Sequence, residues 1–178
     1  LVVRRSNPLN HAIDTISMLP YIMPGSVIAI ALVIGFGRKP LVLTGTLAIM
    51  IIAVIIRRLP YTTRSATATL IQIPITIEEA AISLGASKMK TFFRITVPMM
   101  SSGIVSGAIL SWVSIVTEVS SAVILYNNRS ITLTVGTYSA ISRGNFGAAA
   151  AFATVTTVLT ALSLIVYMRV TKSENIEL

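Results

Sequence analysis

The feature that most constrains this chain is an uncharged, mostly apolar stretch that runs from about residue 147 to residue 168. A helix needs roughly 20 mostly apolar residues to cross the hydrocarbon core of a bilayer. A crossing segment must also satisfy its own backbone N–H and C=O groups, which a helix does. We interpret this stretch as a membrane span, and we interpret three others in the same way, at about residues 16–36, 41–56 and 101–126.

The overall composition agrees with a membrane protein. Of 178 residues, 54% are hydrophobic and 11% are charged, which is more apolar than a soluble domain of this size needs. The sequence therefore predicts an all-α membrane protein, a polytopic bundle forming a single domain over residues 1–178. The net charge of +8 does not indicate nucleic-acid binding, because the basic residues lie in short flanks between apolar runs. With no cysteine, the chain has neither disulfides nor thiolate metal sites.

The distribution of basic residues predicts the orientation. If the polar loop at about residues 60–98 is cytoplasmic, ten of the 14 Lys and Arg residues lie inside and four lie outside. Both termini are then cytoplasmic. The inner group is Arg4, Arg5, Arg57, Arg58, Arg64, Lys88, Lys90, Arg94, Arg169 and Lys172, and the outer group is Arg38, Lys39, Arg129 and Arg143.

Local patterns refine the four spans. Pro20 and Pro24 predict kinks in the first span. Residues 60–72 are expected to continue the second span as a cytoplasmic helix, and residues 133–142 to form a short interfacial helix. Small residues on one face of the third span, and at the start of the fourth, allow helix backbones to approach closely. These residues are Gly103, Gly107, Ser111, Ser114, Gly147 and Ala151.

The cytoplasmic loop contains signals for two short helices. Thr76 and Glu79 have the spacing of a capping box, and Gly85 suits the left-handed end of a helix, which predicts a two-turn helix over residues 77–84. Ser87 is expected to cap a second helix over residues 88–97, with Pro98 at the entry to the next span.

A longer pattern covers both helices. Glu79-Ala80-Ala81 is followed after three residues by Gly85, and after nine more by Ile95-Thr96-Val97-Pro98. This spacing resembles the cytoplasmic E-A-A loop of bacterial ABC importer permeases, with Val97 in place of the usual leucine. The resemblance implies that the loop docks on an ATPase. The candidate coupling residues are Glu79, Ala80, Ala81, Leu84, Gly85, Ile95 and Pro98.

The rest of the chain resembles the C-terminal part of permeases of the ferric-iron importer type. The similar blocks are residues 19–25, 43–46, 57–65, 117–120 and 144–149. This family has a type I importer core of six spans, of which the last four match, so two N-terminal spans are expected to be missing. Full iron permeases often carry two such halves in one polypeptide. Related permeases for 2-aminoethylphosphonate, polyamines and sulfate share several blocks.

The resemblance also implies partners and a location. These are a cytoplasmic ATPase, a second permease core, an extracytoplasmic solute-binding protein and the lipid of the bacterial inner membrane. The chain has no phosphate-binding loop of the kind that ATPases use, so ATP binding and hydrolysis are expected in a partner chain and no cofactor in this one. We therefore predict a permease and not an enzyme, without catalytic residues or a resident metal.

Few residues are candidates for the substrate pathway. Glu118 is the only acidic residue inside a predicted span and suits a hard cation such as ferric iron. A structural alternative is a carboxyl group bonded to a neighbouring helix. Tyr21, Tyr126 and Tyr138 could be further oxygen ligands, although interfacial tyrosines more often serve as anchors. His11, the only histidine, is expected to be solvated.

Two other classes compete with this interpretation. An ion-coupled secondary transporter also uses broken helices, but the single buried acid and the docking loop argue against it. An intramembrane enzyme lacks a nucleophile paired with a base, because the chain has no cysteine and no Gly-x-Ser-x-Gly sequence.

Overall fold

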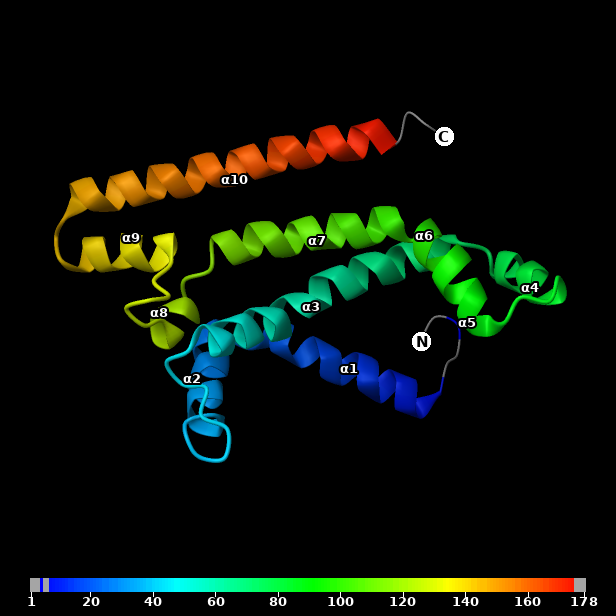
Figure 1. Ribbon diagram of the computed structural model, residues 1–178, viewed down its shortest axis with the longest axis horizontal. Coiled ribbons are helices and arrows are strands. Elements are labelled where there is room, and N and C mark those ends of the chain that lie inside the picture. The colour runs from blue at the N-terminus through cyan, green and yellow to red at the C-terminus, as the bar shows by residue number, and fades with distance from the viewer. Residues whose placement is uncertain (1–3, 5–6, 175–178) are drawn as a thin grey trace. The chain divides into compact units, whose positions relative to one another are not determined.

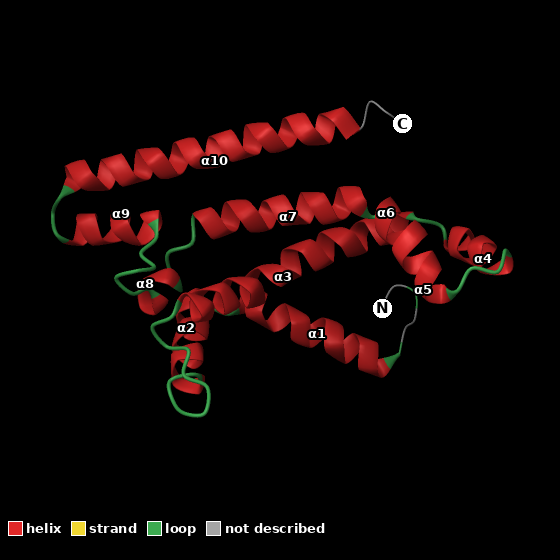
Figure 2. Cartoon of the chain, in the orientation of Figure 1, coloured by secondary structure: helices red, strands yellow, loops and turns green. Residues whose placement is uncertain are grey.

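The computed structural model describes residue 4 and residues 7–174, and every regular element in this part of the chain is a helix (Figure 2). The predicted all-helical class is confirmed. The chain divides into two compact units, Leu1–Ile22 with Arg58–Ser111 and Met23–Arg57 with Trp112–Leu178. Arg5 and the side chain of Lys172, two of the basic groups assigned above to the cytoplasmic side, lie outside the described residues.

The first unit contains α1, the second part of α3, the short elements from α4 to α6, and most of α7 (Figure 1). Their bounds are α1 Pro8–Ile22, α3 Leu47–Gln72, α4 Ile75–Ser83, α5 Lys88–Thr91, the π-helix η1 Phe92–Thr96, α6 Val97–Met99 and α7 Ser101–Val116. A small core of Leu70, Ile73 and Met100 joins the end of α3 to the start of α7.

Helix α3 differs from the predicted second span. It begins at Leu47 rather than near Leu41, because Pro40 and a left-handed Gly45 (φ 76°) keep the preceding residues in a loop. It then continues without a break through Pro60 to Gln72, which confirms the expected helical continuation over residues 60–72. The helix ends where Ile73 precedes Pro74, because a residue before proline disfavours helical backbone.

Small residues bring α7 close to α3. A Cβ added to Gly107 would lie 2.6 Å from the Thr62 Cα atom, and one added to Gly103 would lie 2.9 Å from the Ser65 carbonyl oxygen. Ser111, on the same face, is buried and donates to the Gly107 carbonyl oxygen at 2.9 Å. The predicted role in close helix packing is confirmed for Gly103, Gly107 and Ser111. At Gly147 an added Cβ would meet only the Asn145 side chain, at 3.9 Å, so the predicted close approach of helix backbones is wrong there.

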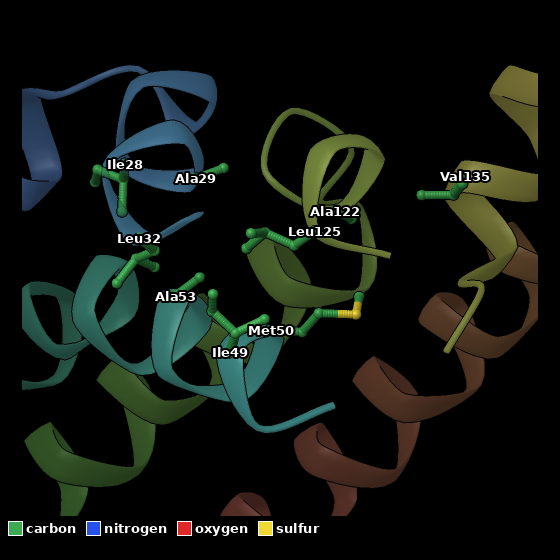
Figure 3. Packing of buried hydrophobic residues seen from close by; sticks show 9 residues of the cluster. All are labelled: Ile28, Ala29, Leu32, Ile49, Met50, Ala53, Ala122, Leu125 and Val135. Atoms are coloured by element: carbon green, nitrogen blue, oxygen red, sulfur yellow. The ribbon is translucent and has the colours of Figure 1, made fainter. Parts of the chain in front are cut away.

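The second unit contains α2, the first part of α3, and the helices that follow α7. Their bounds are α2 Gly25–Gly35, α8 Ala122–Leu125, α9 Leu133–Ser142 and α10 Phe146–Glu174. Helix α9 packs along α10, and its bounds are the predicted residues 133–142 (Figure 1). The core of this unit, shown in Figure 3, consists of Ile28, Ala29, Leu32, Ile49, Met50, Ala53, Ala122, Leu125 and Val135.

Two predicted spans are interrupted. The first breaks at Met23–Pro24 between α1 and α2, whereas Pro20 lies inside α1. The expected continuous helix over residues 101–126 is wrong beyond Val116, because residues 117–121 form a turn before α8. The physical reason for the turn is the Glu118 side chain, which bonds to local backbone and side-chain donors as described below.

One helical segment in the described part of the chain, Phe146–Arg169, is long and apolar enough to cross a membrane unaided. Two interrupted pairs qualify if each counts as one broken span. These are α1 with α2, and the run Lys88–Met99 with α7, which meet at a bend of 64°.

Candidate coupling segment and buried ion pair

Helix α4 begins two residues before the predicted start. Pro74 is the residue at the helix N-cap, with no side-chain cap, and its carbonyl oxygen accepts from the Ile77 N–H at 3.3 Å. Thr76 therefore lies inside the first turn, and the predicted capping box between Thr76 and Glu79 is wrong. Because the rigid Pro74 backbone already turns the chain into the helix, no hydroxyl cap is needed.

The end of α4 matches the prediction. Gly85 has a φ of +87°, which side chains with a Cβ rarely adopt. The Gly85 N–H donates to the Ile82 carbonyl oxygen at 2.9 Å, and the Ala86 N–H donates to the Ala81 carbonyl oxygen at 3.0 Å. These two bonds form a Schellman motif, which satisfies the last carbonyl groups of the helix and fixes the direction of the chain after it.

The second predicted helix is irregular. The Ser87 hydroxyl accepts from the Lys90 N–H at 3.3 Å, so the predicted cap is confirmed. The helix then widens into the π-helix η1, in which the Val97 N–H donates to the Phe92 carbonyl oxygen. Pro98 follows at once and has no N–H to continue the regular pattern, which gives a physical reason for the wide turn at this place.

The seven candidate coupling residues differ in exposure. Leu84 is 89% exposed, and Glu79, Ala80, Gly85 and Pro98 are exposed as well. Ile95 is half-buried. Ala81 is buried inside its own unit at 8% exposure, so its side chain already packs within this chain. The candidate side chains exposed on α4 and at its end are therefore those of Glu79, Ala80 and Leu84.

The Arg4 side chain bonds both to α4 and to the residue that follows α3. Its Nε atom donates to Glu78 Oε1 at 3.0 Å and its Nη2 atom donates to the Ile73 carbonyl oxygen at 2.8 Å. Both side chains of the ion pair are about one-fifth exposed. In the sequence Arg4 is one of several basic residues that flank the spans, and no local motif indicates this contact.

Glu118 lies in the turn between α7 and α8, and its side chain is buried. Its Oε1 atom accepts from the Ser120 hydroxyl at 3.0 Å, from the Ser121 N–H at 3.0 Å and from the Ser121 hydroxyl at 3.2 Å. Its Oε2 atom accepts from Arg57 Nη1. A carboxylate has about four acceptor positions, and four donors point at this one, three of them at Oε1. A cation at this carboxylate would compete with these donors.

Arg57 was not among the site residues predicted from the sequence. Its place in the sequence predicted a position at the cytoplasmic edge, but its guanidinium group pairs with Glu118 and lies against Gly25, where an added Cβ would come within 2.6 Å of Nη1. The sequence did contain a signal for this pair. A lone acid within a span needs a partner, because a buried charge without one is costly in free energy.

The remaining candidates belong to different units. Tyr21 on α1 stacks edge to face with Tyr61 at 5.4 Å in the first unit, whereas Tyr126 and Tyr138 belong to the second. His11 is exposed in the first turn of α1. Among the described residues, no group of three histidine or acidic side chains is placed to hold a metal ion.

Comparison with known proteins identifies the family. Residues 2–173 match the family described as binding-protein-dependent transport system inner membrane component, and the chain belongs to it. This family consists of the permease components of ABC importers.

Three relatives show the range within the family. The chain is 30% identical over 155 residues to the ferric transport system permease protein FbpB of Actinobacillus pleuropneumoniae, covering 87% of this chain and 23% of that protein. It is 30% identical over 151 residues to the "Putative 2-aminoethylphosphonate transport system permease protein PhnV" of Salmonella paratyphi A, covering 85% and 56%. It is 27% identical over 125 residues to the molybdate/tungstate transport system permease protein WtpB of Thermococcus kodakarensis, covering 70% and 49%. The chain thus spans less than two thirds of the length of these relatives.

Proposed function

We propose that this chain forms the last four crossings of a permease core in an ABC importer and that α4 docks on a separate cytoplasmic ATPase. The observation that carries this proposal is Leu84, an apolar side chain 89% exposed at a helix end that a Schellman motif holds in place. Met89, just beyond the Gly85 turn, is 67% exposed. A partner that covers both side chains would remove apolar surface from water.

The other parts of the assembly follow from the family. A second permease core, from another chain or from another half of the same polypeptide, would complete the pathway. A solute-binding protein would deliver substrate from outside, and the ATPase would bind and hydrolyse ATP. We place the chain in the bacterial inner membrane with both termini cytoplasmic.

The Arg57–Glu118 pair leads us to revise where the spans lie in the membrane. Arg57 is about 22 Å along α3 from Gln72, and Val116 is about 22 Å along α7 from Ser101, at about 1.5 Å per residue. If Gln72 and Ser101 both lie at the cytoplasmic surface, Arg57 and Glu118 come to the same depth, in agreement with their contact. Arg57 and Arg58 then leave the inner flank. Arg64, about 12 Å along α3 from Gln72, leaves it as well. The remaining basic residues, seven against four, still favour the same orientation.

The test of the coupling role is the substitution Gly85→Glu. No atom lies within 4 Å of an added Cβ, so within this chain the substitution costs only the strain of a positive φ, about 1–2 kcal/mol. Gly45→Glu is the matched control, because Gly45 has a φ of 76° and equally open surroundings. We expect Gly85→Glu to abolish ATP-driven uptake while Gly45→Glu transports. Equal uptake by the two variants would contradict the proposal.

For the substrate we propose ferric iron, on the basis of the similarity to FbpB. A 2-aminoethylphosphonate, polyamine or sulfate importer is the alternative within the family, since PhnV is equally similar. Uptake of labelled ferric iron in the presence of each unlabelled competitor would distinguish these substrates. Competition by excess unlabelled iron alone is the result we expect.

An ion-coupled secondary transporter also uses helix breaks such as the one at Pro24, but the family to which the chain belongs argues against that class. Trapping with a nonhydrolysable ATP analogue separates the two classes. An importer driven by an ATPase stops when that ATPase is locked, whereas a secondary transporter continues as long as the ion gradient lasts.

A further inference from the structure

The helical run Lys88–Met99, which follows α4 and leads into α7, carries positive charge that the chain does not neutralise. Lys88, Lys90 and Arg94 are all exposed, and no acidic residue occurs in residues 80–117. Within the described residues, none of these three cations forms an ion pair with an acidic side chain. The run therefore presents three positive charges to whatever surrounds it.

The π-helix η1 determines which side of this run packs against the chain. Thr91 and Thr96 are both 3% exposed, although they are five residues apart. In a regular α-helix with 3.6 residues per turn, residues at that spacing lie on different faces. The wide turn, closed by the bond from the Val97 N–H to the Phe92 carbonyl oxygen, brings both threonines to the inner side. The other side chains of this turn are thereby directed away from the core.

The exposed residues of the run fall into two groups. Lys88 and Phe92, four residues apart, line a cavity of about 300 Å³ beside α4, and belong with the coupling surface. Lys90, Phe93 and Arg94 do not line this cavity. Lys90 and Arg94 are also four residues apart, so they are neighbours on one helix face, and Phe93 beside them is 60% exposed. We call Lys90, Phe93 and Arg94 the outer face.

The run is inclined to the helix that follows it. It bends away from α7 by 64°, and α7 is apolar enough to be part of a broken membrane span (Figure 1). If α7 runs close to the membrane normal, the run lies nearer to the plane of the membrane, at the cytoplasmic end of α7. Basic residues mixed with exposed aromatic rings are typical of helices that lie in the membrane interface.

We propose that the outer face is a docking surface for anionic phospholipid headgroups of the cytoplasmic leaflet. Lys90 and Arg94 contact the phosphate groups, and the Phe93 ring lies among the first carbons of the acyl chains. The charge of this face and its direct continuity with a membrane span favour lipid as the occupant over a protein surface. The inference goes beyond the proposed importer function and rests on it only for the cytoplasmic position of the run.

Photocrosslinking to lipids tests this surface. The assembled transporter, with its ATPase, is reconstituted in nanodiscs made of equal parts phosphatidylglycerol and phosphatidylcholine. One of the two lipids carries a diazirine near its headgroup, and lipid adducts on residues 88–99 are quantified by mass spectrometry. We expect at least fivefold more adducts from phosphatidylglycerol, because each basic residue near an anionic surface strengthens the attraction by about that factor. High salt should reduce the preference.

Substitutions on the outer face separate charge from shape. Lys90→Gln/Arg94→Gln should abolish the preference for phosphatidylglycerol, whereas Lys90→Arg/Arg94→Lys, which keeps both charges, should retain it. Phe93→Ser should lower the yield with both lipids by the same factor, because the ring contributes apolar contact and no charge. The matched control is Arg129→Gln/Arg143→Gln, which removes two exposed cations elsewhere in the chain and should leave the preference unchanged.

Three results would overturn the proposal. These are equal yields from the two lipids in the unsubstituted transporter, a preference that survives Lys90→Gln/Arg94→Gln, and adducts of the outer face with the ATPase in place of lipid. ATP-driven uptake by the unsubstituted transporter is measured in vesicles of the same lipids. If uptake is absent while the preference for phosphatidylglycerol depends on Lys90 and Arg94, the importer function fails and the lipid surface stands.

Discussion

The end of α4, in the candidate coupling segment (residues 76–98), and the turn at Glu118 are both short breaks in helical structure, but they place their side chains in opposite ways. At the end of α4, backbone hydrogen bonds satisfy the chain and leave Leu84 89% exposed. At the turn between α7 and α8, the Glu118 carboxylate turns inward and accepts from Arg57, Ser120 and Ser121. The first arrangement leaves an apolar side chain that another molecule could cover. In the second, the carboxylate already accepts hydrogen bonds from residues of the same chain.

This difference separates two kinds of functional candidate. One is an exposed side chain that a partner can cover, and the other is a buried group whose hydrogen-bonding partners lie within the chain. A charged residue within a membrane segment marks function by default. That default loses force when the chain itself supplies the partner, as Arg57 does for Glu118. We therefore regard Glu118 chiefly as a residue that holds the turn. Substrate contact by Glu118 stays a prediction, and the first experiment below decides between the two roles.

The largest expected effect is on stability, from Glu118→Ala. The substitution leaves the largely buried Arg57 side chain, 15% exposed, without its carboxylate partner, so we expect the protein to lose up to about 3–5 kcal/mol. The double variant Arg57→Met/Glu118→Leu is expected to lose less, because neither charge remains. Thermal unfolding of the detergent-purified protein measures both. If Glu118→Ala kept its thermal stability and lost only affinity for substrate, the carboxylate would be a pathway ligand.

The next effect is on transport, from Leu84→Asp. Because Leu84 is exposed, we expect stability to change by less than about 0.5 kcal/mol, while ATP-driven uptake falls more than tenfold. Leu9→Asp on α1 is the control, since Leu9 is 67% exposed in the same unit and outside the coupling segment. Unimpaired uptake by Leu84→Asp would remove the distinction between the two regions.

A smaller effect is expected from Gly85→Ala. Open space surrounds the position, so the cost arises from the positive φ alone and should be about 1–2 kcal/mol. Thermal unfolding of Gly85→Ala and Gly45→Ala should show similar losses, with uptake reduced in Gly85→Ala only. A loss of uptake shared by both variants would mean that backbone strain, rather than coupling, is being measured.

The smallest effect concerns the Arg4–Glu78 pair. With both side chains about one-fifth exposed, their coupling free energy should be no more than about 1 kcal/mol and should decrease in salt. A double-mutant cycle with Arg4→Gln and Glu78→Gln measures it. A coupling well above that value, insensitive to salt, would show that the N-terminal segment anchors α4 more firmly than the structure indicates.

Local chemistry explains what was predictable. Gly85 as a left-handed helix end, Ser87 as a cap and the bounds of α9 were all correct because a few neighbouring residues determine each of them. Thr76 was wrongly assigned because Pro74, two residues earlier, already starts the helix. In that case both Pro74 and Thr76 could have marked the start of the helix, and the helix begins after Pro74, whose backbone is the more rigid.

Contacts between distant residues explain what could not be predicted. The end of α7 at Val116 and the position of Arg57 both depend on an ion pair between residues far apart in the sequence. The bonds from Arg4 to Glu78 and Ile73 are equally distant, and no spacing rule indicates them.

The most direct test of the coupling role places a single thiol at Leu84. Because the 178-residue chain contains no cysteine, Leu84→Cys gives a unique site for crosslinking within it. In intact cells we expect this thiol to be protected from impermeant reagents added outside, and in membranes to crosslink to a nucleotide-binding ATPase subunit identified by mass spectrometry. Labelling from the periplasmic side, or an assembled complex in which the thiol contacts no ATPase, would contradict the account.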